Sequence, residues 1–404
     1  MKPTKTTWIL TLFVMLSCCQ GAVKTGLDRV GAYKNVFEGR RLGIIANHTA
    51  YDRDGKFIVD VFRNMTGVTI TALFSPEHGF WGTARAGEKI NNQTDPVYNL
   101  PVYSLYGKTQ KPTSDMLRNI DVLVFDIQDI GARFYTYIYT MSLAMEAAAQ
   151  NGKTFVVLDR PNPINGLAVE GNILEPKFAS FVGLYPIPVR HGMTVGELAI
   201  MFNRQGWLKG GVKADLVVVS MQNWRRGDWY DRTGLRFIKP SPNMTNLKTA
   251  SVYPGLCLLE GTNVSEGRGT GNPFLLFGAP WIDADDLTAR LNKLSLPGMR
   301  FQPISFTPNA SKYAGERCHG VEITVTKRDL LESYWAGIVI VNEIHWMYPG
   351  HFEWRAGHFD RLCGTADVRN AIKNGSSLQS LKVTWQAKLK TFLQMRKRYL
   401  LYAK

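Results

Sequence analysis

The first half of the chain alternates short apolar runs with segments whose apolar residues recur at helical spacing. The runs are rich in Val, Ile and Leu, a composition typical of strands buried on both faces of a sheet. Strands are therefore predicted over Leu42–Ala46, Val68–Phe74, Val122–Ile127, Phe155–Leu158 and Leu216–Ser220. Helices are predicted between them over 58–63, 141–150 and 195–204. This alternation predicts an α/β fold with a Rossmann-like parallel sheet layered with helices.

The pattern changes near residue 250, where a glycine-rich, irregular stretch runs from Tyr253 to Phe277. Beyond it, helices are predicted over 283–294, 330–347 and 378–399, with a strand over 321–326. We therefore expect a Rossmann-like domain over 23–248 and a smaller α/β or α+β auxiliary domain over 249–404. The auxiliary domain is expected to contribute its glycine-rich loop to a site on the first domain.

The first 22 residues have the order of a secretory signal. Two lysines precede the apolar run Trp8–Leu16, which is too short to span a membrane and ends at small residues and cysteines. A small residue followed by Cys resembles the lipobox of bacterial lipoproteins, with Cys18 or Cys19 as the lipidated residue. Ordinary cleavage near Ala22 is the alternative. Either route predicts an exported, periplasmic protein, and lipidation would anchor it to a membrane.

The formal net charge of +15 favours anionic partners. For an exported protein these are wall polymers, lipid headgroups or acidic sugars, and nucleic acid is not expected. Beyond the signal only Cys257, Cys318 and Cys363 remain, widely spaced and without a CxxC pair, which argues against a zinc site. Three buried thiols are expected, with one disulfide as the alternative. No GxGxxG follows the first strand, so no dinucleotide is expected.

Polar residues directly follow four of the predicted strands. These clusters are Asn47–Thr49, Glu77–His78, Asp126–Asp129 with Arg133, and Asp159–Asn162. The carboxyl ends of parallel strands meet at one edge of a sheet, where ligands bind in open α/β folds. Four such clusters in succession predict an active cleft.

Structural roles remain open for single residues of these clusters. Glu77 can cap a helix that starts at its loop. Asp126 and Asp159 can hold loops by accepting backbone amide bonds, and Arg133 and Arg160 can be their partners.

Other segments add polar and aromatic groups. Arg190 and His191 lie just before a predicted helix N-terminus, a natural anion site. The segment 258–269 combines two carboxylates, an amide and a guanidinium with glycines that allow close approach of the backbone. Aromatic residues flank the strand-end clusters, as at Phe134–Tyr139. Because sugar rings stack on aromatic side chains, this composition favours carbohydrate as the ligand.

Several motifs together resemble a known family. They are SPEHG, FDIQDIGARFYTY, LDRPNPING, PVRHGMTVGELA, PSPNM, EGTNVSEGRGTGNPF and GAPW, in this order. From about Leu42 to the final helix the chain resembles the exo-β-N-acetylmuramidases of the NamZ type, which are peptidoglycan-recycling glycoside hydrolases. The resemblance implies a Rossmann-like catalytic domain with an auxiliary domain, and no metal or organic cofactor. It implies release of N-acetylmuramic acid (MurNAc) from non-reducing ends of peptidoglycan glycans and of MurNAc-GlcNAc fragments derived from muropeptides.

The resemblance and the strand-end position together make Glu77 the expected general acid, which protonates the leaving oxygen. Crowding by Phe80 and Trp81 is expected to raise its pKa, as that role requires. The second carboxylate is expected to be Glu266 or Glu260, with Asp126 as third choice. Attack by the 2-acetamido group of the substrate is the alternative.

Muramic acid carries a lactyl carboxylate, which a bidentate arginine reads well. Arg133, Arg268 and Arg190 are the candidates for this contact. The other residues expected to bind substrate are His78, Asp126, Gln128, Tyr135, Asp159, Arg160, Asn162, His191, Asn243 and Asn263.

Two other functions remain open. One is a non-catalytic peptidoglycan-binding lipoprotein that uses the same cleft as a lectin. The other is a metal-dependent hydrolase built on His48, His78 and Asp126. The sequence leaves open the stereochemical course, the oligomeric state and the tolerance of stem peptides.

Overall fold

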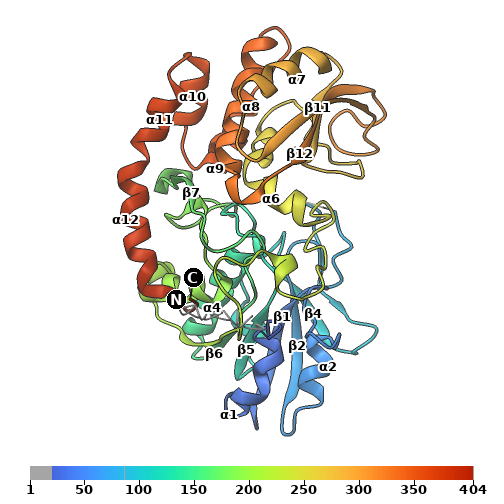
Figure 1. Ribbon diagram of the computed structural model, residues 1–404. Helices are drawn as coiled ribbons and strands as arrows, with labels where there is room; N and C mark the ends of the chain where they lie inside the picture. Colours follow the sequence, from blue (N-terminus) through green and yellow to red (C-terminus); the bar gives the residue numbers. More distant parts are fainter. Residues whose placement is uncertain (1–20, 86, 404) are drawn as a thin grey trace, which may run out of the picture.

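A computed structural model describes residues 21–85 and 87–403 (Figure 1). Most of the expected signal peptide, with Cys18 and Cys19, lies outside the described residues. A seven-stranded sheet occupies the first half of the chain, in the order β3-β4-β2-β1-β5-β6-β9. Its strands are β1 (Arg41–Ala46), β2 (Thr69–Ser75), β3 (Gln93–Thr94), β4 (Pro101–Ser104), β5 (Val122–Asp126), β6 (Thr154–Leu158) and β9 (Asp215–Val219).

All pairs in this sheet are parallel except the pair of β3 and β4. The five strands predicted from apolar runs are confirmed as β1, β2, β5, β6 and β9. The expected α/β class with a parallel, Rossmann-like sheet is also confirmed. The strands β3 and β4 were not predicted because both are short and β4 begins with Pro101. Proline is tolerated at the first residue of a strand, so it does not exclude one.

Helices cover the sheet between its strands. They are α1 (Lys34–Phe37), α2 (Ile58–Arg63), α3 (Ser114–Leu117), α4 (Tyr137–Gln150) and α5 (Val195–Arg204). In α5 a capping box is present, since Thr194 accepts from the Glu197 amide and Glu197 accepts from the Thr194 amide. Almost every residue of α4 is buried, so its aromatic first turn shows no amphipathic pattern and was not predicted as helix.

The second half holds a three-stranded antiparallel sheet in the order β10-β12-β11. Its strands are β10 (Leu276–Ala279), β11 (Met299–Phe306) and β12 (Cys318–Val325). The helices here are α6 (Leu247–Leu256), α7 (Ala284–Lys293), α8 (Ser333–Met347) and α9 (Ala356–Cys363). A two-stranded ribbon of β7 (Glu170–Ile173) and β8 (Pro188–Arg190) completes the strands of the described residues. The three cysteines of this part are buried and free, as expected.

Helices α6 and α8 cross in close contact at two glycines. A Cβ on Gly255 would lie 1.8 Å from the Ser333 carbonyl oxygen, and one on Gly337 would lie 2.2 Å from the Gly255 carbonyl oxygen. The helix α6 contains Pro254 and extends past Tyr253, where the sequence predicted irregular structure. That prediction was wrong for residues 253–261, where α6 and a 3-10 helix continue, because the packing of α6 against α8 outweighs the low helix propensity of proline and glycine. The remainder, up to β10, is irregular as expected.

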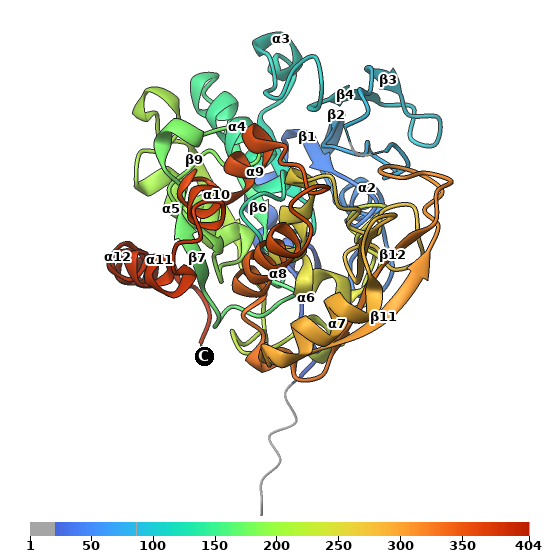
Figure 2. The ribbon, with the colours of Figure 1, turned by 90° about the horizontal axis from the view of Figure 1, so that it is seen from above.

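The chain ends with α10 (Asp367–Lys373), α11 (Leu378–Thr384), α12 (Gln386–Arg396) and a 3-10 turn, Lys397–Tyr399. The predicted final helix is therefore interrupted at Trp385. Figures 1 and 2 show α11 and α12 along one flank of the molecule, leading back to the first half of the chain. None of the helices in the described part is long and apolar enough to cross a membrane.

Candidate active site

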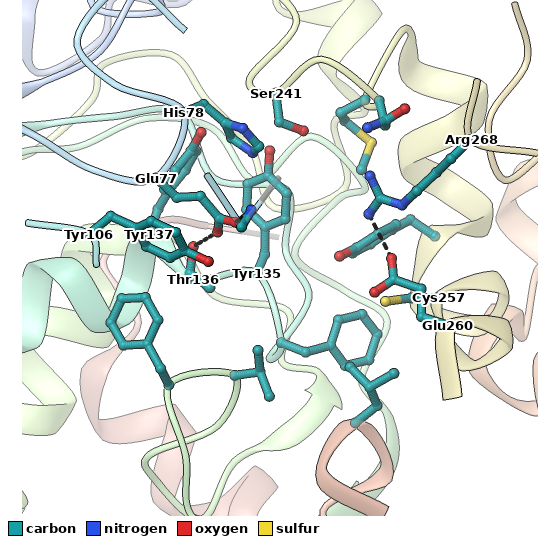
Figure 3. A pocket seen from close by; sticks show the side chains of 18 of the residues that line it. Glu77, His78, Tyr106, Tyr135, Thr136, Tyr137, Ser241, Cys257, Glu260 and Arg268 are labelled. Carbon is teal, nitrogen blue, oxygen red and sulfur yellow. Dashed lines mark hydrogen bonds and ion pairs between the residues drawn. The ribbon is translucent and has the colours of Figure 1, made fainter. Parts of the chain in front are cut away.

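A cavity of about 530 Å³ opens where the carboxyl end of β2 faces the second half of the chain. Figure 3 shows Glu77 and Thr136 on one side, and Glu260 and Arg268 on the other. Its polar lining residues include Glu77, His78, Lys89, Tyr106, Gln110, Tyr135, Thr136, Tyr137, Ser241, Asn243, Tyr253, Glu260, Arg268 and His358. The cavity thus combines one strand-end cluster with residues from the second half of the chain.

The loop after β2 projects Glu77 into this cavity. Successive left-handed residues, His78 with φ 71° and Gly79 with φ 80°, reverse the chain just after the carboxylate. A non-glycine residue in this conformation stores strain, and such strain is concentrated at functional sites. The observation agrees with a loop shaped for the position of Glu77 rather than for stability.

Neutral donors hold the Glu77 carboxylate. Thr136 Oγ1 donates to Oε2 at 2.9 Å, and the Gly87 amide donates to Oε1 at 3.2 Å. Tyr106 also hydrogen-bonds Glu77, and burial and this carboxylate together raise the pKa of the Tyr106 phenol. The carboxylate therefore has no cationic partner within bonding distance among the described residues, and its donors orient it without neutralising it.

The expected crowding of Glu77 by Phe80 and Trp81 is not what the structure shows. Both rings pack against Phe57, and the Trp81 indole donates to Asp95 at 2.7 Å. The aromatic groups on the Glu77 side of the cavity are instead Tyr106, Tyr135 and Tyr137.

His78 is buried beside Glu77, and its Nδ1 lies 2.9 Å from the Ala84 carbonyl oxygen. Burial lowers the His78 pKa, Glu77 and the Ala84 carbonyl act against this, and Arg268 lowers it further. The imidazole is therefore neutral at neutral pH, with one nitrogen committed to the backbone.

The opposite wall is a network of charges. Arg268 Nη2 lies 2.6 Å from Glu260 Oε1, and Arg268 Nε lies 3.2 Å from Glu266 Oε1. Glu266 is also paired with Lys312 Nζ at 2.9 Å. Burial alone would raise the Glu260 pKa, but Arg268 and His358 lower it to about 2. Glu260 therefore remains a carboxylate at neutral pH and cannot serve as the general acid.

The three candidates for the second carboxylate differ in whether they line the cavity. Glu260 lines the cavity, whereas Glu266 is buried behind it between two cations. Asp126 is buried in a bidentate ion pair with Arg160, with 2.8 Å between Asp126 Oδ2 and Arg160 Nη2. The structure thus brings only Glu260 of the three to the cavity that holds Glu77.

Arg133 has a structural position instead of a substrate-facing one. Its Nη1 donates to the carbonyls of Asn172 and Ile187, both at 2.9 Å. Its Nη2 donates to the carbonyls of Leu362 and Cys363, at 3.0 and 2.6 Å. This fully buried guanidinium ties the ribbon of β7 and β8 to α9 and cannot reach the lactyl carboxylate in this conformation.

Arg190 and His191 are also buried away from the cavity. Arg190 pairs with Glu170 at 2.6 Å. His191 Nδ1 accepts from the Met193 amide, and burial with the nearby Arg396 and Arg190 lowers its pKa to about 3.

Three further predicted residues hold loops in place. Asp159 accepts from Thr194 Oγ1 and the Gly196 amide, both at 2.8 Å, at the start of α5. Asn162 donates to the Met193 carbonyl, and Asn263 donates to the His351 carbonyl. The loop-holding alternative considered for Asp159 is therefore confirmed.

The predicted residues that do line the cavity are Glu77, His78, Tyr135, Asn243, Glu260 and Arg268. Tyr106, Thr136, Ser241 and His358 were not predicted. Tyr106 follows β4, so recognising that strand would have placed it beside the predicted strand ends. His358 carries no local signal, because it reaches the cavity only through the packing of α9.

The metal-site hypothesis finds no support in the geometry. His48 Nε2 and His78 Nδ1 each lie within bonding distance of a backbone carbonyl, and Asp126 is paired with Arg160. No group of three His, Cys, Asp or Glu residues within the described ranges is placed to hold a metal ion.

Comparisons with known proteins give one consistent family. The family models for the N-terminal and C-terminal parts of the exo-β-N-acetylmuramidase NamZ match residues 42–248 and 251–402. The peptidoglycan β-N-acetylmuramidase NamZ of Bacillus subtilis (strain 168) is 49% identical over 382 residues, covering 94% of this chain and 91% of that protein.

Two solved structures of DUF1343 family proteins from Bacteroides fragilis NCTC 9343 share the fold. One has a TM-score of 0.88 at 37% identity, covering 94% of this chain and 99% of the other. The second has a TM-score of 0.77 at 34% identity, covering 95% and 99%. With both family models matched in order along its length, the chain belongs to the NamZ family of exo-β-N-acetylmuramidases.

Proposed function

We propose that the protein is an exo-acting glycosidase that releases N-acetylmuramic acid from the non-reducing ends of peptidoglycan glycans and MurNAc-GlcNAc fragments. The observation that carries this proposal is the position of Glu77, a carboxyl group held by neutral donors in a cavity between the two halves of the chain. The relative from Bacillus subtilis, named as a peptidoglycan β-N-acetylmuramidase, supports the substrate class.

In this proposal Glu77 protonates the glycosidic oxygen as the bond to the leaving sugar breaks. Thr136 and Tyr106 orient the carboxyl group, so that its proton points to the leaving oxygen. Glu260 is the second carboxylate, because it lines the opposite wall and stays ionised. It stabilises the positive charge that develops on the sugar ring, or orients the 2-acetamido group if that group attacks.

Arg268 is the proposed reader of the lactyl carboxylate. It is the only one of the three predicted arginines that the described residues bring to the cavity lining. Its Nη1 makes no hydrogen bond within the described part of the chain, whereas Nε and Nη2 face Glu266 and Glu260. The free nitrogen is available to a substrate carboxylate.

The test compares a chromogenic β-MurNAc glycoside with its β-GlcNAc analogue. Glu77→Gln is expected to lower kcat by at least about a hundredfold, as loss of a general acid does. Glu316→Gln, which removes an exposed carboxylate that does not line the cavity, is the matched control. Near-normal turnover by Glu77→Gln would eliminate this mechanism. Retention on peptidoglycan without release of sugar by the unmodified protein would favour the lectin alternative.

We also propose that the protein is exported to the periplasm and anchored through Cys18 or Cys19. The support is the signal-like order of the first 22 residues. The unmodified protein is expected in the membrane fraction, and the Cys18→Ala, Cys19→Ala double variant in the soluble fraction. Equal distribution of the two proteins would contradict the lipid anchor.

A further inference from the structure

A second cavity, of about 400 Å³, lies at the carboxyl ends of β1, β5 and β6. The sheet order places β2 on one side of β1 and β5 on the other, so the direction of sheet growth reverses between β1 and β5. This topological switch point is where ligands bind in open α/β sheets. The proposed active site uses the end of β2, so the switch point has no assigned function.

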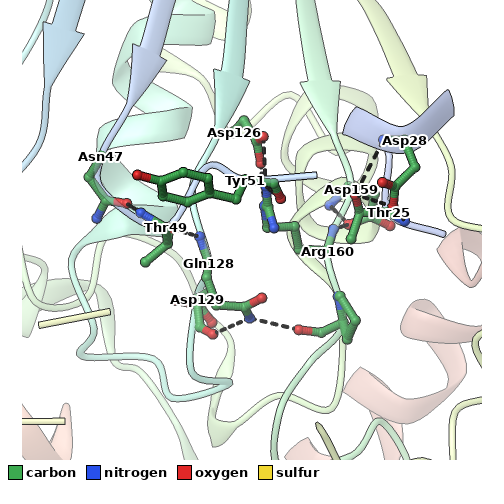
Figure 4. Close-up of polar contacts among 12 residues, drawn as sticks. Thr25, Asp28, Asn47, Thr49, Tyr51, Asp126, Gln128, Asp129, Asp159 and Arg160 are labelled. Atoms are coloured by element: carbon green, nitrogen blue, oxygen red, sulfur yellow. Dashed lines mark hydrogen bonds and ion pairs between the residues drawn. The ribbon is translucent and has the colours of Figure 1, made fainter. Parts of the chain in front are cut away.

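The floor of this second cavity contains a buried guanidinium with a free nitrogen. Arg160 is 4% exposed, and its Nε and Nη2 are held by Asp126 (Figure 4). Nη2 also donates to the Tyr51 carbonyl at 3.1 Å. The remaining nitrogen, Nη1, has no hydrogen-bond partner among the described residues, and Arg160 lines the cavity. An oxygen of an anionic ligand is the partner that such a donor suits best.

Gln128 adds an unpaired acceptor beside Arg160. The side chain is 3% exposed, and its Nε2 donates to the carbonyls of Asp129 and Pro161, at 2.7 and 2.8 Å (Figure 4). These two bonds fix the orientation of the amide, and Oε1 has no partner within the described structure. A buried polar atom without a partner is rare in folded proteins. Oε1 has almost no accessible surface, so this fixed amide shapes the cavity and does not itself contact the ligand.

The other residues that line the cavity indicate further properties of its ligand. Tyr51 and Tyr230 provide rings, with Leu235 and Ile238 between polar groups. On the rim, Arg53 and Arg236 are exposed, and neither forms an ion pair with a carboxylate of the described residues.

Acidic groups around the cavity are already occupied. Asp52 Oδ1 accepts from the amides of Asp54 and Lys56, and Asp126 is paired with Arg160. Among the residues that line the cavity, three arginines, Arg53, Arg160 and Arg236, stand against one carboxylate, Asp52, so the lining carries an excess of positive charge.

We propose that this second cavity binds a monosaccharide that carries one anionic group, either a sugar acid or a sugar phosphate. The arginines bind the anionic group, and the tyrosine rings contact the apolar face of the sugar. The volume lies in the range of small-molecule sites. The proposal extends the proposed function, whose released product is itself a sugar acid.

The two cavities share one wall, the segment 235–244. His48, which lines the second cavity, has its Nε2 2.6 Å from the Lys239 carbonyl oxygen. Tyr137, which lines the active-site cavity, donates to the Pro240 carbonyl, also at 2.6 Å. A ligand in the second cavity therefore lies one chain segment away from the substrate.

The experiment counts bound ligands by equilibrium dialysis at millimolar probe concentration. The probes are N-acetylmuramic acid, N-acetylglucosamine 6-phosphate and uncharged N-acetylglucosamine. The test variant is Arg53→Glu, Arg236→Glu, which reverses two exposed rim charges. The matched control is Arg300→Glu, an exposed arginine on β11 that lines neither cavity. Leu235→Trp, which fills the second cavity, provides an independent variant.

The rim variant (Arg53→Glu, Arg236→Glu) and Leu235→Trp are each expected to bind one molar equivalent of an anionic probe less than the unmodified protein does. Arg300→Glu is expected to bind as much as the unmodified protein. The affinity of the lost site should fall at least about tenfold, and the uncharged sugar should not occupy it. The probe that binds distinguishes a carboxylate from a phosphate source. The same occupancy in the rim variant as in the unmodified protein, or no binding of either anionic probe, would overturn the proposal. If the active-site cavity does not bind the probe because the proposed function is wrong, the unmodified protein still binds one equivalent of an anionic probe, in the second cavity. The rim variant then binds none.

Discussion

The roles of single residues in the active-site cavity follow from their partners more than from their types. Glu77 and Glu260 are both cavity-lining glutamates, but neutral donors hold the first and Arg268 pairs with the second. The Arg268 guanidinium keeps Glu260 ionised against the effect of burial, whereas the donors to Glu77 carry no charge. The sequence predicted Glu77 from its motif, but nothing in the sequence alone could separate Glu260 from Glu266.

Tyr106→Phe tests whether orientation of Glu77 contributes to catalysis. Removal of the hydroxyl deletes a hydrogen bond to Glu77, so kcat is expected to fall about tenfold with little change in KM, since proton transfer depends on geometry. Tyr103→Phe is the control. Tyr103 lies in β4, shortly before Tyr106, and its ring packs on Phe74. Steady-state kinetics on the chromogenic glycoside provide the readout, and equal rates for both variants would contradict the role.

The ion pair of Glu260 predicts an acid-labile contribution to stability. Its pKa is lowered from 4.5 to about 2 in the folded protein, so the unfolded state binds the proton more tightly. The stabilisation is therefore fully present above about pH 4.5 and is lost as the pH falls toward about 2. Urea unfolding at several pH values should show this loss in the unmodified protein and a smaller loss in Glu260→Gln. If the free energy of unfolding depends on pH in the same way in both proteins, the contribution of Glu260 is contradicted.

At the scale of elements, strands buried on both faces were easy to predict and short strands were not. The apolar runs of β1, β2, β5, β6 and β9 carry their own signal, because both faces need apolar side chains. The short strands β3 and β4, and the helix α6 with its Pro254, are defined by their neighbours. The cavity depends on these missed elements, since Tyr106 follows β4 and Tyr253 lies in α6.

The crossing of α6 and α8 gives a sharp prediction. Gly255→Ala would place a Cβ 1.8 Å from the Ser333 carbonyl oxygen, so the helices must separate. The free energy of unfolding is expected to fall by about 3 kcal/mol, the upper range for overpacking. Gly357→Ala in α9, where the nearest atom to an added Cβ is 3.7 Å away, is expected to be neutral or slightly stabilising. Urea unfolding of both variants measures the difference, and similar midpoints would show that the crossing tolerates displacement.

At the scale of the whole molecule, the sequence predicted that four strand-end clusters share one cleft, and the structure divides them between two cavities. Glu77 follows β2, whereas Arg160 follows β6, three strands away in the sheet order. With neighbouring strands about 4.8 Å apart, these ends are separated by about 14 Å. Sequence periodicity identifies the strands that end at an edge but not their order along it. One cluster per strand therefore could not reveal how many sites the edge holds.

The last residue of α12 and the C-terminal segment after it link the end of the chain to the first half. Arg396 Nη2 donates to the Gly192 carbonyl at 2.5 Å, the Leu401 amide donates to Glu197 Oε1 at 2.8 Å, and Tyr402 Oη donates to Asp159. Asp159 and Glu197 are fully buried at the start of α5, so removal of their donors would leave buried carboxylates with fewer hydrogen bonds.

Deletion of residues 401–404 is therefore expected to lower the free energy of unfolding by about 3 kcal/mol, because each lost bond to a buried charged group costs about 1.5–3 kcal/mol. Tyr402→Phe removes the bond that the hydroxyl donates to Asp159 and the bond that it accepts from the Met221 amide, but keeps the bond from the Leu401 amide to Glu197, and should cost about half as much. Lys390→Ala, at an exposed position of α12, serves as the control. Neither change touches the cavity of Glu77, so kcat measured well below the unfolding temperature should stay within about twofold of the unmodified protein. A loss of activity without a loss of stability would mean that this segment acts on the active site itself.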